Sequence, residues 1–209
     1  MPRPRTFDEA EVIERARRAF AETGFAGTSL DDLLEATGLA RQSLYNAFGG
    51  KKELFMRAFL SDTSSAVDAV KTVMRSAQDP IARVRTQLVS TAVEHGSAQA
   101  PPSLLLRAAV EFSGSDPEVA TIVATAFDAM RADYTACIRD AQHAGEIDAD
   151  ADAEALGTYF CAVIEGMSTL GRAGLARATL LQMGFTSLAA VPITSRGREH
   201  LGTEDGDWT

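Results

Sequence analysis

The chain has 209 residues, 45% of them hydrophobic, and a formal net charge of −9 at pH 7. This length can hold a small domain fused to a larger one, each with a core of its own. No stretch approaches the roughly 18 uncharged apolar residues of a transmembrane helix, and the first residues lack the apolar segment of a signal peptide, so we expect a cytoplasmic protein.

The acidity belongs to the second part of the chain. Residues 1–57 carry nine Lys and Arg and nine Asp and Glu, a net charge of zero, whereas residues 58–209 carry eleven and twenty, a net charge of −9. A locally positive surface on this neutral first part suits a nucleic-acid partner. The basic residues expected at its helix ends and turns are Arg3, Arg5, Arg41, Lys51 and Lys52.

Four closely spaced helices are predicted before residue 76. A capping box of Thr6 and Glu9 opens the first helix, and Gly24 ends it. The second helix has its cap at Thr28 or Ser29. The predicted segments are residues 7–23, the stretch from that cap to a tight turn at Gly38, residues 40–47, and residues 51–75.

Five further helices follow, and no strand pattern appears. Asp79-Pro80 and Asp116-Pro117 each provide an N-cap and a first helical position. From Pro192 onward the chain has little core-forming content and is predicted to be a polar tail. The five segments run from 79 to a loop over 96–103, over 104–112, from 116 to Gly145, from 152 to Gly171, and over 175–188.

The outer face of segment 40–47 is polar and contains no acid. Its underside, formed by Leu39, Leu44 and Phe48, is apolar. A short helix with these two faces suits the major groove of DNA. The alternative is an ordinary helical hairpin with a solvated face, although such faces usually mix charge signs. The outward residues are Arg41, Gln42, Ser43, Tyr45 and Asn46.

Lys51 and Lys52 stand in the first turn of the fourth helix, where positive charge opposes the helix dipole. A DNA phosphate bound at this helix N-terminus would remove the penalty. The alternative is a pair of solvated lysines that cost little stability.

Residues 7–60 resemble the helix-turn-helix of the TetR-type transcriptional regulators. The resemblance implies an all-α fold, with a three-helix DNA-binding domain over residues 1–66 whose helix-turn-helix spans 29–48. It further implies a ligand-binding and dimerisation domain over 67–191 and a polar tail over 192–209, with about nine helices in all. The residues that carry it are Gly24-Phe25, Thr28-Ser29, Leu33, Gly38-Leu39, Ser43-Leu44-Tyr45, Phe48, Lys51, Leu54 and Phe55.

The resemblance also implies a function. Such proteins are sequence-specific DNA-binding regulators, most often repressors, that bind near-palindromic operators as homodimers and respond to a small-molecule effector. We expect Arg41 to contact a guanine, with Gln42 and Ser43 at neighbouring base edges. Where the family often has a small residue or proline, this chain has Gln42, so the base preference does not transfer. The remaining expected DNA-binding residues are Thr28, Tyr45, Lys51, Asn46, Lys52, Arg3 and Arg5.

An effector pocket is expected in the second domain, where aromatic and methionine side chains recur along the predicted helices. For any one of these residues a filled core is the alternative. The anticipated effector is small and mostly hydrophobic or aromatic. The expected pocket residues are Leu105, Phe112, Phe127, Met130, Tyr134, Cys137, Phe160, Ile164 and Met167, and the resemblance places a dimer interface on the last two helices, at Leu181, Phe185 and Leu188.

No residues pair a nucleophile with a base, so we expect no catalytic activity, and an all-α enzyme is a remote alternative. The stretch from Gly166 to Gly171 comes near a nucleophile elbow, but its second glycine is one residue late and its context is helical. The histidines have no metal-ligand spacing, so neither a metal nor a cofactor is expected.

Two smaller questions stay open. Cys137 and Cys161 allow a regulator of the same fold that responds to thiol chemistry or to a protein partner, although buried hydrophobic cysteines fit the pattern better. Arg107 and Glu111 are four residues apart on one helix. They form either a simple surface pair or polar anchors of a ligand pocket.

Overall fold

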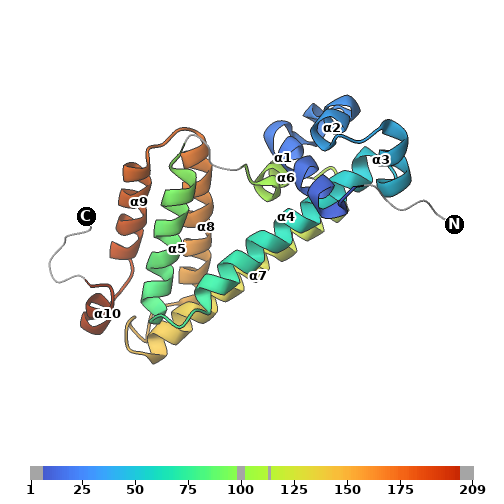
Figure 1. Ribbon diagram of the computed structural model, residues 1–209. Coiled ribbons are helices and arrows are strands. Elements are labelled where there is room, and N and C mark those ends of the chain that lie inside the picture. The colour runs from blue at the N-terminus through green and yellow to red at the C-terminus, as the bar shows by residue number, and fades with distance from the viewer. Residues whose placement is uncertain (1–6, 98–101, 113, 203–209) are drawn as a thin grey trace. The chain divides into compact units, whose positions relative to one another are not determined.

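The computed structural model describes residues 7–97, 102–112 and 114–202 (Figure 1). Every regular element in these ranges is an α-helix, which confirms the predicted fold class, and an isolated β-bridge joins Ile147 to Ile193. None of these helices is both long and apolar enough to cross a membrane. The helices are α1 (Glu9–Gly27), α2 (Leu30–Thr37), α3 (Arg41–Phe48), α4 (Lys51–Met74), α5 (Pro80–His95), α6 (Leu104–Glu111), α7 (Pro117–His143), α8 (Ala153–Arg172), α9 (Arg177–Ala189) and α10 (Ser195–His200).

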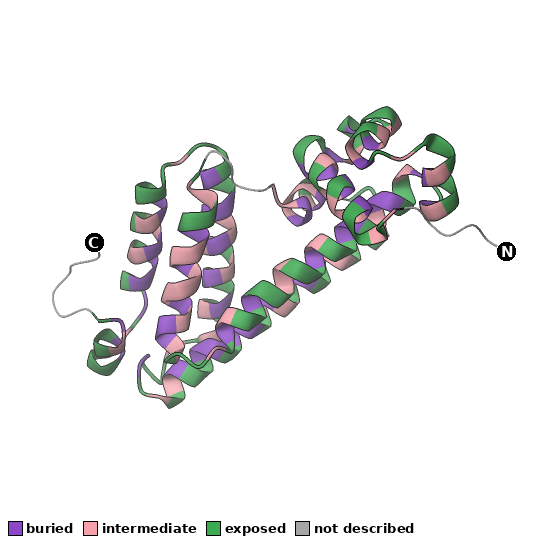
Figure 2. Ribbon diagram, in the orientation of Figure 1, coloured by how far each residue is buried: buried purple, intermediate pink, exposed green. Residues whose placement is uncertain are grey.

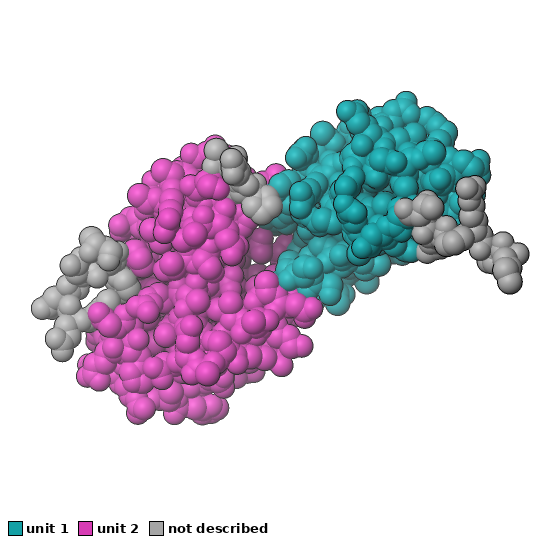
Figure 3. Space-filling view, in the orientation of Figure 1, with its two compact units in different colours: residues 1–66, 102–126 teal, residues 67–101, 127–209 magenta. Residues whose placement is uncertain are grey.

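The chain divides into two compact units, which Figure 3 colours separately. Unit 1 comprises residues 1–66 and 102–126, and unit 2 comprises residues 67–101 and 127–209. The helices α4 and α7 each contribute one part to either unit. The short helix α6 thus groups with the helix-turn-helix, although the resemblance assigned it to the second domain.

Phenylalanine rings form much of the core of unit 1. Phe20 and Phe55 are almost wholly buried and meet edge to face, with ring centroids 5.2 Å apart. Phe55 also contacts Phe25, and both contact Phe112, the C-cap residue of α6, at 5.1–5.6 Å. Such pairs contribute about 0.5–1.5 kcal/mol each beyond the area they bury. The rings therefore tie α6 to the helices before residue 60.

Side-chain caps and glycines set the ends of the first three helices. The N-cap of α1 is Asp8, whose carboxylate accepts a hydrogen bond from a backbone N–H of the first turn, so the capping box predicted from Thr6 is wrong. Of the two predicted caps of α2, Ser29 is the N-cap, and it forms a complete capping box with Asp32. Gly38 adopts the left-handed φ of +70° that closes the turn between α2 and α3.

In unit 2, α5, α8 and α9 lie side by side (Figure 1). Their facing sides are buried, as the purple stripes in Figure 2 show, and include Leu88, Phe160 and Leu180. Close helix contact also depends on Gly157 of α8, where a Cβ atom would lie 2.2 Å from Oγ1 of Thr135 on α7.

The helix α10 lies in the segment predicted to be a polar tail. Thr194 caps it by accepting a hydrogen bond from the Gly197 N–H at 3.2 Å, and the flanking Val191 and Leu201 are buried. The Thr194 N–H donates to the carbonyl of Glu146 at 2.9 Å. Two isolated apolar residues and a long-range hydrogen bond leave no periodic signal in the sequence, which explains the omission.

Candidate nucleic-acid interface

The helix α3 exposes the face that the sequence predicts to read DNA. Leu44 and Phe48 are buried in unit 1, which turns the opposite side of the helix to solvent. The Arg41 side chain is 57% exposed and Tyr45 is 47% exposed. Gln42 and Asn46 are exposed as well, and Ser43 is half-buried. The expected outward residues therefore share one surface.

A carboxylate from α2 holds Arg41 in place. The Nη2 atom of Arg41 lies 2.6 Å from Oδ1 of Asp31. The exposed face of α3 itself therefore has no acidic residue, but Asp31 of the neighbouring helix α2 places a carboxylate beside it. Since exposed ion pairs contribute only about 0–1 kcal/mol, the guanidinium can exchange Asp31 for a base or a phosphate at little cost.

Gln42 and Asn46 are paired one helical turn apart. The Nε2 atom of Gln42 donates to Oδ1 of Asn46 at 3.0 Å. Each amide retains further hydrogen-bonding atoms beyond this bond. The pair therefore presents a preformed set of donors and acceptors next to Arg41.

The two lysines of the first turn of α4 have different partners. The Nζ atom of Lys51 lies 4.4 Å from the centroid of the Phe25 ring, a cation–π contact. Lys52 forms an ion pair with Asp116, and this hydrogen bond raises the pKa of Lys52. A phosphate at Lys52 has to compete with Asp116. Lys51 forms no ion pair in the described part of the chain, although Asp32 is close enough to interact with it electrostatically.

The burial of Thr28 does not suit its expected contact with DNA. The residue is only 1% exposed, and its Oγ1 donates to the carbonyl of Gly24 at 2.6 Å and lies 2.7 Å from Oγ1 of Thr23. The hydroxyl closes the end of α1 and is unavailable to DNA in this conformation. Arg3 and Arg5, also expected at DNA, lie outside the described residues.

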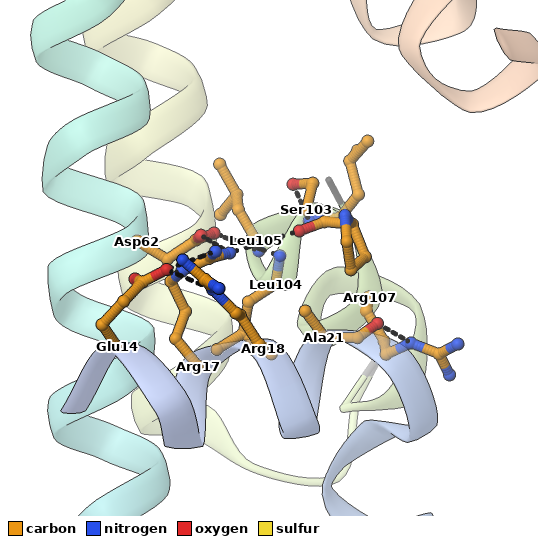
Figure 4. A network of polar contacts seen from close by, with 11 residues as sticks. Glu14, Arg17, Arg18, Ala21, Asp62, Ser103, Leu104, Leu105 and Arg107 are labelled. Carbon is orange, nitrogen blue, oxygen red and sulfur yellow. Dashed lines mark hydrogen bonds and ion pairs between the residues drawn. The ribbon is translucent and has the colours of Figure 1, made fainter. Parts of the chain in front are cut away.

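Asp62 of α4 connects α1 with α6 (Figure 4). Its carboxylate lies 3.1 Å from Nη1 of Arg17 and accepts hydrogen bonds from the N–H groups of Leu104 and Leu105, both at 3.1 Å. These are N–H groups that α6 itself cannot satisfy. Burial raises the pKa of Asp62, while the N–H groups and Arg17 oppose that rise.

Arg107 of α6 binds the last turns of α1. Its Nε donates to the Ala21 carbonyl at 2.9 Å and its Nη2 donates to the Glu22 carbonyl at 2.8 Å. The first of these bonds is visible in Figure 4. An arginine satisfies carbonyls that a helix end otherwise leaves to solvent.

Glu111, one turn further along α6, also binds the end of α1, so that Arg107 and Glu111 together form a clamp on α1. Its Oε2 accepts from the Phe25 N–H at 2.8 Å and its Oε1 from the Ala26 N–H at 2.6 Å. Between the two sets of bonds, Gly24 has a φ of +83° and breaks the helical geometry of α1. Arg107 and Glu111 therefore fasten α6 to α1 across the kink, and neither sequence-based alternative describes them fully.

A shallow apolar cavity of about 210 Å³ opens in unit 1 between α6 and the first turns of α7. Ala108, Phe112, Val119 and Val123 are among its lining residues. Ala108 lies in α6 between the two clamp residues, so this cavity borders the helix that carries the clamp.

Most of the expected effector residues come together in unit 2, and two do not. Leu105 and Phe112 belong to unit 1, where Phe112 is part of the ring cluster. Phe127 is half-buried in unit 2. The residues buried there are Met130, Tyr134, Cys137, Phe160, Ile164 and Met167.

Polar groups also occur within this apolar region of unit 2. The Tyr134 hydroxyl is buried and has no hydrogen-bond partner among the described residues. Burial raises the pKa of Glu165 to about 7. This α8 residue was not among the predicted effector residues. Burial, followed by the nearby Cys161 and Glu165, raises the pKa of Tyr134. The sequence signal for Glu165 is its position as an acid within the apolar stripe of α8.

The thiols are poorly suited to redox chemistry. Burial raises the pKa of Cys137 to about 12 and that of Cys161 to about 11. The Sγ atom of Cys137 also donates to the Pro80 carbonyl at 3.3 Å. Because the thiolate is the reactive form, these raised pKa values disfavour reaction of either thiol near neutral pH.

The three expected dimer residues on α9 differ in burial. Leu181 and Phe185 are half-buried within one chain. Leu188 is 1% exposed and belongs to the core of unit 2. Because its own chain already covers it, Leu188 offers almost no surface to a partner, unlike Leu181 and Phe185.

Comparison with known proteins finds matches to both the N-terminal and the C-terminal part of the chain. A family model described as bacterial regulatory proteins of the tetR family matches residues 12–58, and one described as the tetracyclin repressor-like C-terminal domain matches residues 103–180. The HTH-type transcriptional regulator YezE of Bacillus subtilis is 32% identical over 163 residues, covering 76% of this chain and 83% of its own length. The HTH-type transcriptional repressor ComR of Escherichia coli is 26% identical over 199 residues, which is 91% of either protein.

Solved structures show the same fold. A cysteine mutant of the TetR family regulator CifR, complexed with 26-bp operator DNA, has a TM-score of 0.74 and 28% identity, covering 91% of this chain and 100% of that chain. A TetR transcriptional regulator from Chloroflexus aurantiacus has a TM-score of 0.78 at 21% identity, covering 89% of this chain and 96% of that one.

Proposed function

Because the chain belongs to the TetR family of bacterial transcriptional regulators, we propose that it represses transcription by binding a near-palindromic operator as a homodimer. The observation that carries this proposal is the α3 face, where exposed Arg41, Gln42 and Tyr45 stand on a helix with a buried underside. The operator complex of the related CifR mutant supports it. A single reading helix offers a small interface, so tight specific binding calls for two subunits.

Selection of DNA duplexes from a randomised library, followed by footprinting, tests this proposal. We expect a near-palindromic site whose half-sites lie about one helical turn apart, roughly 34–36 Å. Enrichment of no sequence, or of sites without symmetry, would contradict it.

The phosphate contact proposed at Lys51 can be tested on the same duplexes. Lys51→Ala should weaken binding to selected and unrelated sequences alike and reduce the slope of log affinity against log salt by about 1. Lys71→Ala, an exposed lysine of the α4 part in unit 2, is the control and should leave the slope unchanged. A loss confined to the selected sequence would assign Lys51 to base recognition instead.

We further propose that a small effector, mostly apolar and carrying one hydrogen-bonding group, releases the repressor from DNA. Met130, Phe160 and Met167 supply apolar surface in unit 2. The unpartnered Tyr134 hydroxyl and the Glu165 carboxyl supply polar partners. The effector must bind the DNA-incompetent state more tightly, because equal affinity for both states shifts no equilibrium.

A thermal-shift panel of small aromatic alcohols, amines and carboxylic acids tests the effector class. We expect alcohols or amines to raise the melting temperature and to release the selected operator, and Tyr134→Phe to weaken both responses. A Cys137→Ser/Cys161→Ser double variant should respond like the unaltered chain. If oxidants release operator from the unaltered chain but not from this double variant, the signal is thiol chemistry.

A further inference from the structure

Three side chains of metal-ligand type converge in unit 2 from distant parts of the sequence. Asp79 precedes α5, Glu146 follows α7, and His200 ends α10. The Nδ1 atom of His200 lies 2.7 Å from Oε1 of Glu146 and 3.6 Å from Oδ2 of Asp79. One ligand atom from each residue lies within 4.8 Å of the other two. This cluster has no role in the DNA interface or in the proposed effector site.

Glu146 is the innermost of the three and is wholly buried. Its Oε2 accepts a hydrogen bond from the Ile81 N–H at 2.8 Å, and its Oε1 faces His200. A buried carboxylate requires a positive partner to offset its lost hydration. A divalent metal ion bound beside Glu146 would supply that positive charge.

Asp79 is placed as a helix cap but does not act as one. It is the N-cap residue of α5, followed by Pro80 at the first helical position, yet its side chain makes no capping hydrogen bond. Glu146 takes the Ile81 N–H that such a cap would satisfy. The Asp79 carboxylate, 57% exposed, faces His200 instead. The Asp79 carboxylate oxygens therefore remain available to a metal ion that approaches from solvent.

Interactions that involve no ligand atom hold the three residues in position. The Glu146 carbonyl accepts from the Thr194 N–H at 2.9 Å, and Gly197 packs so closely that a Cβ atom would lie 2.3 Å from that oxygen. Arg85 donates to the carbonyl of Leu201, the residue after His200, at 2.6 Å. The site is therefore preorganised, which lowers the cost of binding an ion.

We propose that Asp79, Glu146 and His200 bind a divalent transition-metal ion such as Zn²⁺, which fastens α10 to α5 and to the turn after α7. Two ligand atoms that are each about 2.1 Å from an ion lie about 3.0–3.4 Å apart at octahedral to tetrahedral angles. The observed 2.7 and 3.6 Å bracket this range, so small side-chain rotations complete the site. The Ile81 N–H orients the Glu146 carboxylate from behind, and water fills the remaining positions.

The donor set also indicates which ions are excluded. An imidazole nitrogen with two carboxylate oxygens suits Zn²⁺ and its neighbours in the first transition row. Mg²⁺ and Ca²⁺ prefer oxygen ligands throughout, and Ca²⁺ requires six to eight of them. The sequence could not show the site because its ligands occupy positions 79, 146 and 200, far outside the short spacings of recognisable metal motifs.

Calorimetric titration of the metal-stripped full-length protein tests the proposal. We expect one Zn²⁺ per chain and no binding of Mg²⁺. Asp79→Asn and His200→Gln should each weaken Zn²⁺ binding by roughly tenfold or more. His143→Gln, an exposed histidine elsewhere in unit 2, is the matched control and should bind as the unaltered chain does. Zn²⁺ should also raise the melting temperature, and Asp79→Asn should abolish that rise.

Cobalt substitution separates this site from the cysteines. The Co²⁺ spectrum should lack the thiolate charge-transfer band that ligation by Cys137 or Cys161 would produce. The proposal is overturned if the chain binds no Zn²⁺, if the thiolate band appears, or if Asp79→Asn binds Zn²⁺ unchanged. The Asp79 variant keeps the test decisive where His200→Gln loosens α10, because the exposed Asp79 side chain caps no helix.

Discussion

Arg41 is bonded to Asp31 in the free protein, and DNA binding has to replace that bond. Arg41→Ala should weaken binding to the selected operator by about 1–3 kcal/mol and relax the preference at one base position. The comparison of affinities for operator variants measures both effects. An operator preference that survives Arg41→Ala unchanged would remove this residue from base recognition.

Asp31→Asn should have the opposite effect, because it releases the guanidinium and removes a negative charge beside the reading face. We expect tighter binding to the operator with little change in thermal stability, since the exposed pair contributes only about 0–1 kcal/mol. Asp128→Asn is the matched control, an exposed acid paired with Arg131 at 3.2 Å in unit 2. Equal effects of the two substitutions would mean that overall charge, not Arg41, sets the affinity.

Glu165 makes stability depend on pH in a defined direction. Its carboxyl holds a proton more tightly in the folded chain, with a pKa of about 7, than in the unfolded chain, near 4.5. Its contribution to stability is therefore complete below about pH 4.5 and is lost as pH rises through about 7. Glu165→Gln resembles the protonated form and should not show this loss.

Urea denaturation at two pH values measures the difference. At about pH 8 the Glu165→Gln variant should be more stable than the unaltered chain by on the order of 1–3 kcal/mol, and at about pH 4.5 the two should agree. Glu94→Gln, an exposed acid of α5, provides the control. A constant difference between the two proteins across this pH range would exclude titration of Glu165 as the cause.

At the scale of the helices, the clamp from α6 should stabilise the C-terminal end of α1. Glu111→Ala removes the acceptor of the Phe25 and Ala26 N–H groups, and we expect a loss of roughly 1–2 kcal/mol because water replaces part of these bonds. Hydrogen exchange should accelerate at these two amides. Glu22→Ala, which removes an exposed charge of the same sign from α1, should leave their exchange unchanged. Unchanged protection of these amides in Glu111→Ala would mean that the two bonds from Glu111 contribute nothing.

The helices that the sequence predicts best are those with local signals at their ends. The Ser29–Asp32 capping box, the left-handed Gly38 and the proline at α5 all stand within a few residues of the boundary they set. Such short-range interactions do not depend on tertiary contacts, so they can be predicted from the sequence. By contrast, α10 depends on Glu146, a partner far away in the chain, and was missed.

The same distinction explains what could be predicted of the sites. The polar face of α3 follows from helical period alone, and the structure exposes it. The bond from Asp31 to Arg41 and the clamp of Arg107 and Glu111 follow from how separate helices meet. Residue spacing carries no information about such contacts, so their roles required the structure.

At the scale of the whole molecule, the proposed near-palindromic operator calls for two subunits, and we expect their interface to involve α8 and α9. Leu181 and Phe185 are half-buried within one chain, so a partner can cover what remains of them. Leu188, two turns beyond Leu181 on α9, is already covered by its own chain. A charged residue introduced at Leu181 should therefore have a different effect from one introduced at Leu188.

Leu181→Glu should split the dimer and abolish operator binding while the helical content and cooperative unfolding of the subunit persist. Leu188→Glu should instead unfold unit 2, because a charge buried without a partner costs several kcal/mol. Sedimentation with circular dichroism distinguishes the two outcomes, and operator binding measured on the same samples links assembly to function. A dimeric Leu181→Glu protein with full operator affinity would place the interface elsewhere, and an unaltered chain that sediments as a monomer at micromolar concentration would contradict the dimer itself. Two-fold symmetry repeats the substitution on both subunits, so one charge introduces two like charges at the interface, and that repulsion makes a null result informative.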